Sequence, residues 1–264
     1  MRSSTLTGFL FLSLLSFCFV PSLSEAASGK AAFSCPKGMV AVAGGWFWRG
    51  SSKGRLDERP RRRIYLRSFC LDRHEVTAGA YRRCVRKGKC RAMKGPRLDF
   101  RRPAAFLRWK DAVAYCRWAG KRLPTEAEWE KAARAGRTSA KTPVKGRLQC
   151  NKANYGALRS YRCRRGHPLK TRTVKHYRPG PNGLYDMAGN VAEWVQDCYD
   201  ASFYRKGPAK NPVKRGCKRF ASRVVRGGSF ASPATDLRIT ARMAVVPSTV
   251  FSDVGFRCAA APVK

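Results

Sequence analysis

The sequence is poor in acidic residues and in histidine. Its 264 residues include 16 Asp and Glu against 55 Lys and Arg, and only three His. No Cys-x-x-Cys pair is present, so the sequence argues against a zinc site. It also lacks zinc-finger, RNP and helix-turn-helix signatures, which argues against specific recognition of nucleic acid.

Long apolar runs are absent after residue 26, so no later segment is expected to cross a bilayer. Residues 1–26, by contrast, are typical of a signal peptide. Arg2 precedes an apolar run over residues 6–20, and Ser24-Glu25-Ala26 has the small-x-small pattern of a cleavage site. We expect cleavage after Ala26 and export to the periplasm or the medium. Residues 27–264 then form one domain.

The formal net charge is +39, and the basic residues are spread along the chain. Such a surface is expected to bind polyanions with a strong dependence on salt. Lipid head groups and acidic polysaccharides are candidate partners. The alternative is a generally basic surface without a specific partner.

Ten cysteines remain after the expected cleavage, since Cys18 lies in the leader. An even number in an exported chain predicts disulfides. Nearest-neighbour order suggests the pairs Cys35–Cys70, Cys84–Cys90, Cys150–Cys163 and Cys198–Cys217.

Local signals predict a mixture of short helices and strands. Thr77 is expected to cap a helix that ends before Gly88, and a second helix is expected over residues 111–119. Thr125 and Glu128 have the spacing of a capping box, which starts a third helix running to about residue 135. Apolar residues alternate over 40–48 around Gly44-Gly45, which indicates a hairpin or a bulged strand.

Residues 182–197 carry the densest set of motif residues. Asn190 and Glu193 stand three residues apart beside Gly189, and their oxygens, with a backbone carbonyl, suit a hard cation such as Ca²⁺. The alternative is a turn in which the Asn side chain caps its own backbone.

Several segments resemble the formylglycine-generating enzyme family, also called sulfatase-modifying factors. Residues 183–194 read GLYDMAGNVAEW, residues 112–130 read AVAYCRWAGKRLPTEAEWE, and residues 226–229 read RGGS before a terminal GFR at 255–257. The resemblance covers nearly all of residues 36–260. It implies an irregular, disulfide-rich α+β fold of the C-type-lectin-like type, and one further disulfide, Cys116–Cys258.

The resemblance also implies metal sites. Asn190, Glu193 and the backbone of Val191 are expected to hold a structural Ca²⁺, and Asn154 is a weaker candidate for a second site. The family's oxidases convert a cysteine in exported sulfatases to formylglycine, using O₂ and a Cu(I) ion held by two cysteines. Those cysteines lie three and eight residues after the serine of RGGS, where this chain has Ser232 and Leu237. Neither side chain suits Cu(I), so copper is not expected.

Polar residues of the equivalent cleft remain candidates for binding an anionic ligand. They are Ser229, Ser232, Arg226 and Arg242, with Arg238, Asp253 and Arg257. The alternative is that the arginines anchor the core through carboxylates.

The sequence thus predicts an exported, monomeric family member without copper oxidase activity, a Ca²⁺-stabilised accessory module for an anionic partner. One alternative is an enzyme of the same family that uses other residues, either in generating formylglycine or in tailoring small molecules. The other is a nonspecific polyanion binder.

Overall fold

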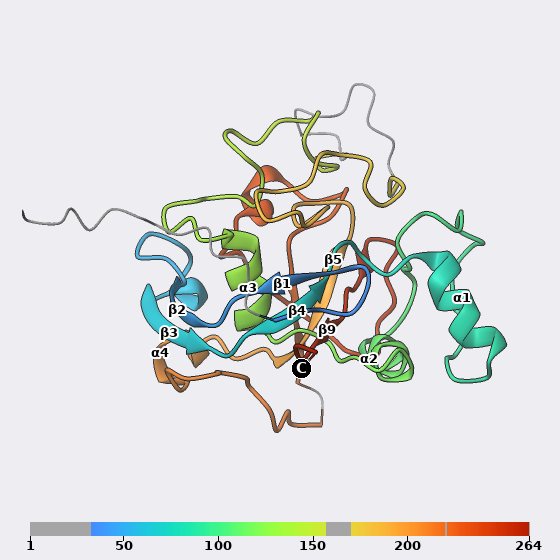
Figure 1. The fold of residues 1–264 in the computed structure, drawn as a ribbon, viewed down its shortest axis with the longest axis horizontal. Helices are drawn as coiled ribbons and strands as arrows, with labels where there is room; N and C mark the ends of the chain where they lie inside the picture. Colours follow the sequence, from blue (N-terminus) through green and yellow to red (C-terminus); the bar gives the residue numbers. More distant parts are fainter. Residues whose placement is uncertain (1–32, 157–169, 220, 264) are drawn as a thin grey trace, which may run out of the picture. The chain divides into compact units, whose positions relative to one another are not determined.

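The computed structural model describes residues 33–156, 170–219 and 221–263, and Figure 1 shows its ribbon. Four α-helices are present in these ranges, α1 (Ala78–Arg86), α2 (Trp109–Trp118), α3 (Glu126–Arg134) and α4 (Phe203–Lys206). Nine short strands accompany them, β1 (Met39–Val42), β2 (Gly45–Arg49), β3 (Arg62–Leu66), β4 (Phe69–Asp72), β5 (Ala192–Cys198), β6 (Arg223–Arg226), β7 (Met243–Val245), β8 (Val254–Gly255) and β9 (Ala259–Ala260). Two 3₁₀ turns lie at Leu56–Glu58 and Ala234–Leu237. Short elements joined by long loops confirm the expected irregular α+β fold.

The strands form three small sheets. One has the order β1-β4-β9 and is antiparallel, and a second pairs β2 with β3. The third has the order β7-β6-β5-β8, in which only β5 and β8 run parallel. Helix α3 packs against β2, β5 and β6, and so links the second sheet to the third.

The hairpin expected around Gly44-Gly45 is wrong, because β1 and β2 belong to different sheets. β1 pairs with β4 and β2 with β3. The Gly44 N–H donates to Ser68 Oγ at 2.9 Å, and a Cβ on Gly44 would lie 2.9 Å from the Ser68 backbone nitrogen. Gly45 has a φ of +117°. The close approach therefore lies where the β1–β2 link and the β3–β4 link each pass from one sheet to the other.

The helices begin and end where side-chain chemistry predicts. The Ala80 N–H donates to Thr77 Oγ1 at the start of α1, and Gly88 beyond its end has a φ of +66°. Thr125 and Glu128 form the expected capping box of α3. α2 begins two residues earlier than predicted, at Trp109, because Asp111 accepts the backbone N–H of Arg108 and fixes an earlier first turn.

Two apolar clusters form most of the core. One collects residues of α1 and α2 with Trp194 and Phe256, and the other surrounds Trp129 of α3. Both tryptophans are fully buried. No helix in the part of the chain that the structure describes has both the length and the apolar character needed to cross a membrane.

Four of the disulfides suggested by the sequence are present. They are Cys35–Cys70, Cys84–Cys90, Cys116–Cys258 and Cys198–Cys217. The expected Cys150–Cys163 pair stays a prediction, because Cys163 lies outside the described residues.

Candidate functional site

The loop after β6 brings Ser229 and Ser232 together. Gly227 and Gly228 both have positive φ, and a Cβ on Gly228 would lie 2.7 Å from Leu237 Cδ1. Ser229 Oγ donates to Asp253 Oδ2 at 2.7 Å and lies 3.2 Å from Ser232 Oγ, which also accepts the Ser229 N–H. Both serines are buried. The result is a hydroxyl–carboxylate cluster that contains no sulfur.

The second position expected to match a copper ligand is part of the apolar core. Leu237 is fully buried and packs with Ala153, Tyr155 and Ala188. Val144 and Leu148 cover the same cluster from the loop that precedes it. A side chain in this position is closed to solvent and packs in an apolar cluster.

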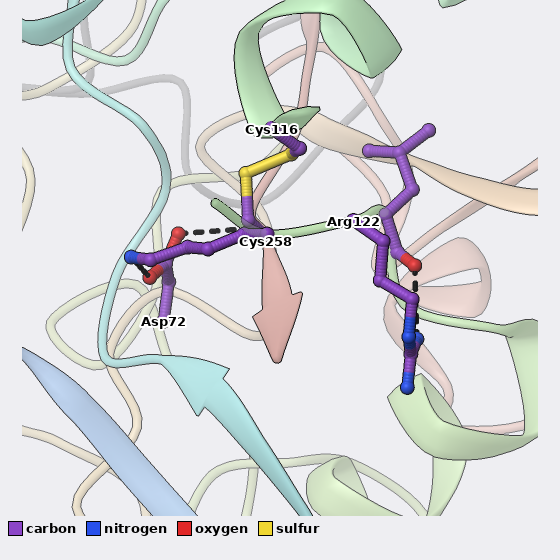
Figure 2. Close-up of a disulfide and its surroundings, with 6 residues drawn as sticks. Asp72, Cys116, Arg122 and Cys258 are labelled. Carbon is purple, nitrogen blue, oxygen red and sulfur yellow. Dashed lines mark hydrogen bonds and ion pairs between the residues drawn. A yellow bond between two sulfur atoms is a disulfide. The ribbon is translucent and has the colours of Figure 1, made fainter. Parts of the chain in front are cut away.

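The remaining cysteine after Ser229 is held in a structural bond. Figure 2 shows Cys258 joined to Cys116 beside Asp72. The Asp72 carboxylate accepts the Cys258 N–H at 2.9 Å and also the Lys121 ammonium. Both cysteines are fully buried, so Cys258 supplies no thiolate.

The two arginines expected in a cleft are instead held by buried carboxylates. Arg242 donates to both oxygens of Glu126, at 2.6 and 2.9 Å. Arg226 donates to Glu126 at 3.2 Å and to Glu130 at 3.0 Å. These four side chains are at most 2% exposed. The alternative weighed from the sequence, that the arginines anchor the core, describes this arrangement.

Burial and charge act in opposite directions inside this network. Burial raises the pKa of Glu130, but the charges of Arg134 and Arg226 outweigh it and hold that pKa below its usual value. Asp197, which accepts the backbone N–H of Glu126, has its pKa raised to about 7 by burial and then by the charge of Glu126. The network therefore contains one carboxyl group that titrates near neutrality.

Asn190 and Glu193 are both buried, but protein donors occupy their oxygens. Asn190 Oδ1 accepts the Arg172 backbone N–H at 2.8 Å and the Asn154 amide at 3.4 Å. Both Glu193 oxygens accept the Arg257 guanidinium, at 2.7 to 2.9 Å, and Oε2 also accepts the Trp129 indole.

The fit of this site to Ca²⁺ is therefore poor as arranged. No group of three or more His, Cys, Asp or Glu suited to a metal occurs among the residues that the structure describes. Asn154 Oδ1 is buried and has no hydrogen-bond partner among the residues that the structure describes, so it could accept a further donor or bind a cation. The calcium site stays a prediction of the resemblance.

Glu75 is the residue of this region that the sequence reasoning missed. It is fully buried, and both of its oxygens accept the Asn190 amide, at 3.0 and 3.2 Å. Burial, and next the charge of Asp186, raise the pKa of Glu75 well above its usual value. Glu75 stands two residues before the helix cap Thr77, but nothing local in the sequence showed that Asn190, 115 residues away, would be its partner.

A second candidate site is a cavity whose lining residues do not include the Ser229 cluster. It has a volume of about 710 Å³, and its floor includes Ala132, Leu184 and Met187. Lys145, Lys152, Arg178 and Asp186 are also among its lining residues. Burial raises the pKa of Asp186 to about 6. The cavity offers an apolar floor with cations and one titratable acid.

Comparison with known proteins places the chain in a family. The model of the sulfatase-modifying factor enzyme 1-like domain matches residues 24–262, and the chain belongs to this family. It is 40% identical over 189 residues to the formylglycine-generating enzyme of Streptomyces coelicolor, covering 66% of this chain and 59% of that enzyme.

Two further similarities concern a longer relative and a solved structure. The chain is 37% identical over 242 residues to the serine/threonine-protein kinase pkn1 of Chlamydia pneumoniae, covering 84% of this chain but spanning only 37% of the length of that relative. Its fold is similar to that of PvdO from Pseudomonas aeruginosa, with a TM-score of 0.70, 27% identity, and coverage of 84% of this chain and 93% of that one. The expected family fold is confirmed.

Proposed function

We propose that this chain is an exported binding module for an anionic partner and that it does not oxidise cysteine with copper. The absence of copper oxidase activity is supported by the chemistry around Ser229. Ser232 is a buried hydroxyl bonded to Ser229, and Leu237 is fully buried in hydrocarbon. Cu(I) requires soft sulfur ligands, which neither residue provides.

Binding of an anionic partner is supported by a cationic surface on α1 and the loop that follows it. We call it the α1 surface, and it consists of seven exposed basic residues, Arg83, Arg86, Lys87, Lys89, Arg91, Lys94 and Arg97. The Cys84–Cys90 disulfide closes the helix onto the loop and fixes this part of the surface. None of the seven forms an ion pair with another described residue, although ion pairs are frequent elsewhere in the chain.

Crowded and unpaired cations favour binding of an anion for two reasons. Their mutual repulsion is relieved when an anion lies among them, and condensed counterions are released from a polyanion when it binds. Arg83 and Arg86 also lie in the last turn of α1, where the helix dipole stabilises positive charge.

The proposal is tested by reversing two charges at a time. Lys87→Glu/Lys89→Glu alters the α1 surface, and Arg215→Glu/Lys218→Glu, on exposed residues of the loop before β6, is a control of equal charge change. On a heparin column we expect the α1 variant to elute at clearly lower salt than the control. If both variants eluted at equally reduced salt, only the net charge would matter, and the chain would be a nonspecific polyanion binder.

A second candidate function uses the cavity of about 710 Å³. Its cations and the raised pKa of Asp186 favour a small anionic molecule with an apolar body, and an enzymatic reaction on it. Asp186→Asn distinguishes the two functions, because it alters this cavity and leaves the α1 surface intact. Unchanged heparin retention with lost small-molecule turnover would favour the enzyme.

Calcium is a separate proposal that rests on the resemblance. If Ca²⁺ binds near Asn190 and Glu193, Arg257 has to release Glu193 first. Thermal unfolding in Ca²⁺ and in chelator decides the point, since a ligand that binds only the folded state raises the transition temperature. Equal transition temperatures would remove Ca²⁺ from the proposal.

A further inference from the structure

The outward face of the β2–β3 ribbon exposes two tryptophans. Along β2 the side chains alternate, so Trp46 and Trp48 point outward while Phe47 points inward. Trp46 is 48% exposed and Trp48 is 39% exposed. Large apolar rings side by side at a surface are uncommon without a ligand or partner.

Arg63 of β3 and Arg61, which directly precedes that strand, lie beside these rings. The Arg61 guanidinium lies 4.8 Å from the ring centroid of Trp48, and that of Arg63 lies 5.6 Å from Trp46. Tyr65 is the cross-strand partner of Trp46 and packs edge-on to it at 5.7 Å. We call these five residues the Trp–Arg ladder.

The ladder arginines keep their hydrogen-bonding edges available. A guanidinium that lies over a ring uses its face, while its N–H groups still point outward. Neither Arg61 nor Arg63 forms a side-chain hydrogen bond or an ion pair with another residue that the structure describes, and both are exposed. Each of the two exposed tryptophans therefore has a cationic fork beside its ring.

A groove of about 550 Å³ runs beside the ladder. Trp46, Trp48 and Arg63 are among its lining residues, as is Lys131 of α3. Lys131 donates to the Gly45 carbonyl at 2.9 Å, and burial lowers its pKa to about 8, so it stays largely charged at pH 7. The described residues that line the groove include no Asp or Glu.

We propose that the Trp–Arg ladder and this groove form a binding subsite for an acidic glycan. Pyranose rings lie against Trp46 and Trp48, and their carboxylate or sulfate groups accept hydrogen bonds from Arg61 and Arg63. The recessed groove favours an extended chain over a flat membrane, and the absence of acidic lining residues favours a charged sugar over a neutral one. This inference deepens the proposed function by naming the chemistry of the anionic partner.

The test is titration of the whole protein with a hexamer of galacturonic acid, followed by tryptophan fluorescence and calorimetry. Trp48→Ala is expected to weaken binding about tenfold, which is the scale of one lost stacking contact. Trp118→Ala is a matched control on α2, since Trp118 is 38% exposed. It should change the affinity less than twofold. Trp48→Phe, which keeps a ring, should recover most of the loss.

Charge is tested with the same ligand in two forms. Arg63→Ala should weaken binding of the hexamer severalfold and make it less dependent on salt, because one charge contact is lost. The fully methyl-esterified hexamer should bind at least tenfold more weakly to the wild type. Equal binding of the acidic and esterified forms would overturn the assignment of an acidic glycan.

Other outcomes separate this inference from the proposed function. If Trp48→Ala and Trp118→Ala bind the hexamer alike while charge reversal on the α1 surface weakens heparin binding, the ladder is not the subsite but the proposed function stands. If neither Trp48→Ala nor charge reversal on the α1 surface weakens binding, the glycan subsite and the proposed function are both refuted. Tighter binding of single-stranded DNA or phosphatidylglycerol vesicles that is lost in Trp48→Ala would also overturn the glycan proposal.

Discussion

Replacing Glu126 by alanine tests whether the buried arginines are anchors of the core. The Glu126 carboxylate receives three hydrogen bonds from Arg242 and Arg226, and all three side chains are at most 2% exposed. Glu126→Ala leaves these guanidiniums without that counter-charge. Glu130 still pairs with Arg226, but no carboxylate remains to pair with Arg242 among its described hydrogen bonds.

The expected cost is about 3–5 kcal/mol in the free energy of unfolding, the range for removing one partner of a buried ion pair. Part of the loss is offset at Asp197, because the charge of Glu126 contributes to its pKa of about 7. The matched control is Glu128→Ala, two residues along the same helix. Glu128 caps the helix and pairs with Arg122, whose side chain is 42% exposed, so we expect a cost of only about 1–2 kcal/mol.

Urea unfolding at pH 7, followed by tryptophan fluorescence, measures both costs. The buried rings of Trp129 and Trp194 give the signal. If Glu126→Ala cost no more than Glu128→Ala, the arginines would not depend on this carboxylate. Arg226 and Arg242 would then not be anchors of the core.

Two further predictions concern pH and crosslinks. Asp186 has a folded pKa of about 6, above the value of about 4 in an unfolded chain, so the wild type should lose stability relative to Asp186→Asn as pH rises from 4 to 6. Asparagine tolerates the φ of +55° there. A urea midpoint of the wild type that rises relative to that of Asp186→Asn between pH 4 and 6 would contradict the assignment. Removing Cys116–Cys258, which spans 142 residues, should cost about 5 kcal/mol, against about 2 kcal/mol for Cys84–Cys90, which spans six. Equal losses on denaturant unfolding would argue against the chain-entropy account.

The helices could be predicted because their signals are local. Thr77 and the pair Thr125 and Glu128 stand next to the turns that they cap, and the structure places these caps as expected. The change of sheet at Gly44 could not be predicted in the same way. It depends on Ser68, 24 residues away, and the alternation of apolar residues carries no information about which strand is the partner.

The candidate site depends even more on contacts between residues that are distant in the sequence. The spacing of Asn190 and Glu193 suggested a cation, but Glu75 and Arg257 lie 115 and 64 residues from them and engage the same side chains. The absence of copper ligands could be predicted, because it requires only counting residues along the chain from Ser229 to Ser232 and Leu237. The exposure of Trp46 could not be predicted, because Trp46, Phe47 and Trp48 are consecutive apolar residues and do not indicate which face of the strand is buried.

Copper loading tests the central claim most directly. The purified protein would be incubated with Cu(I) in a competing chelator, its bound copper measured, and a peptide containing Cys-x-Pro-x-Arg then supplied with O₂. With Ser232 and Leu237 at the positions that we compare with the copper ligands, we predict no stoichiometric copper and no aldehyde product. One bound copper per chain, with formylglycine formed in the peptide, would contradict the account.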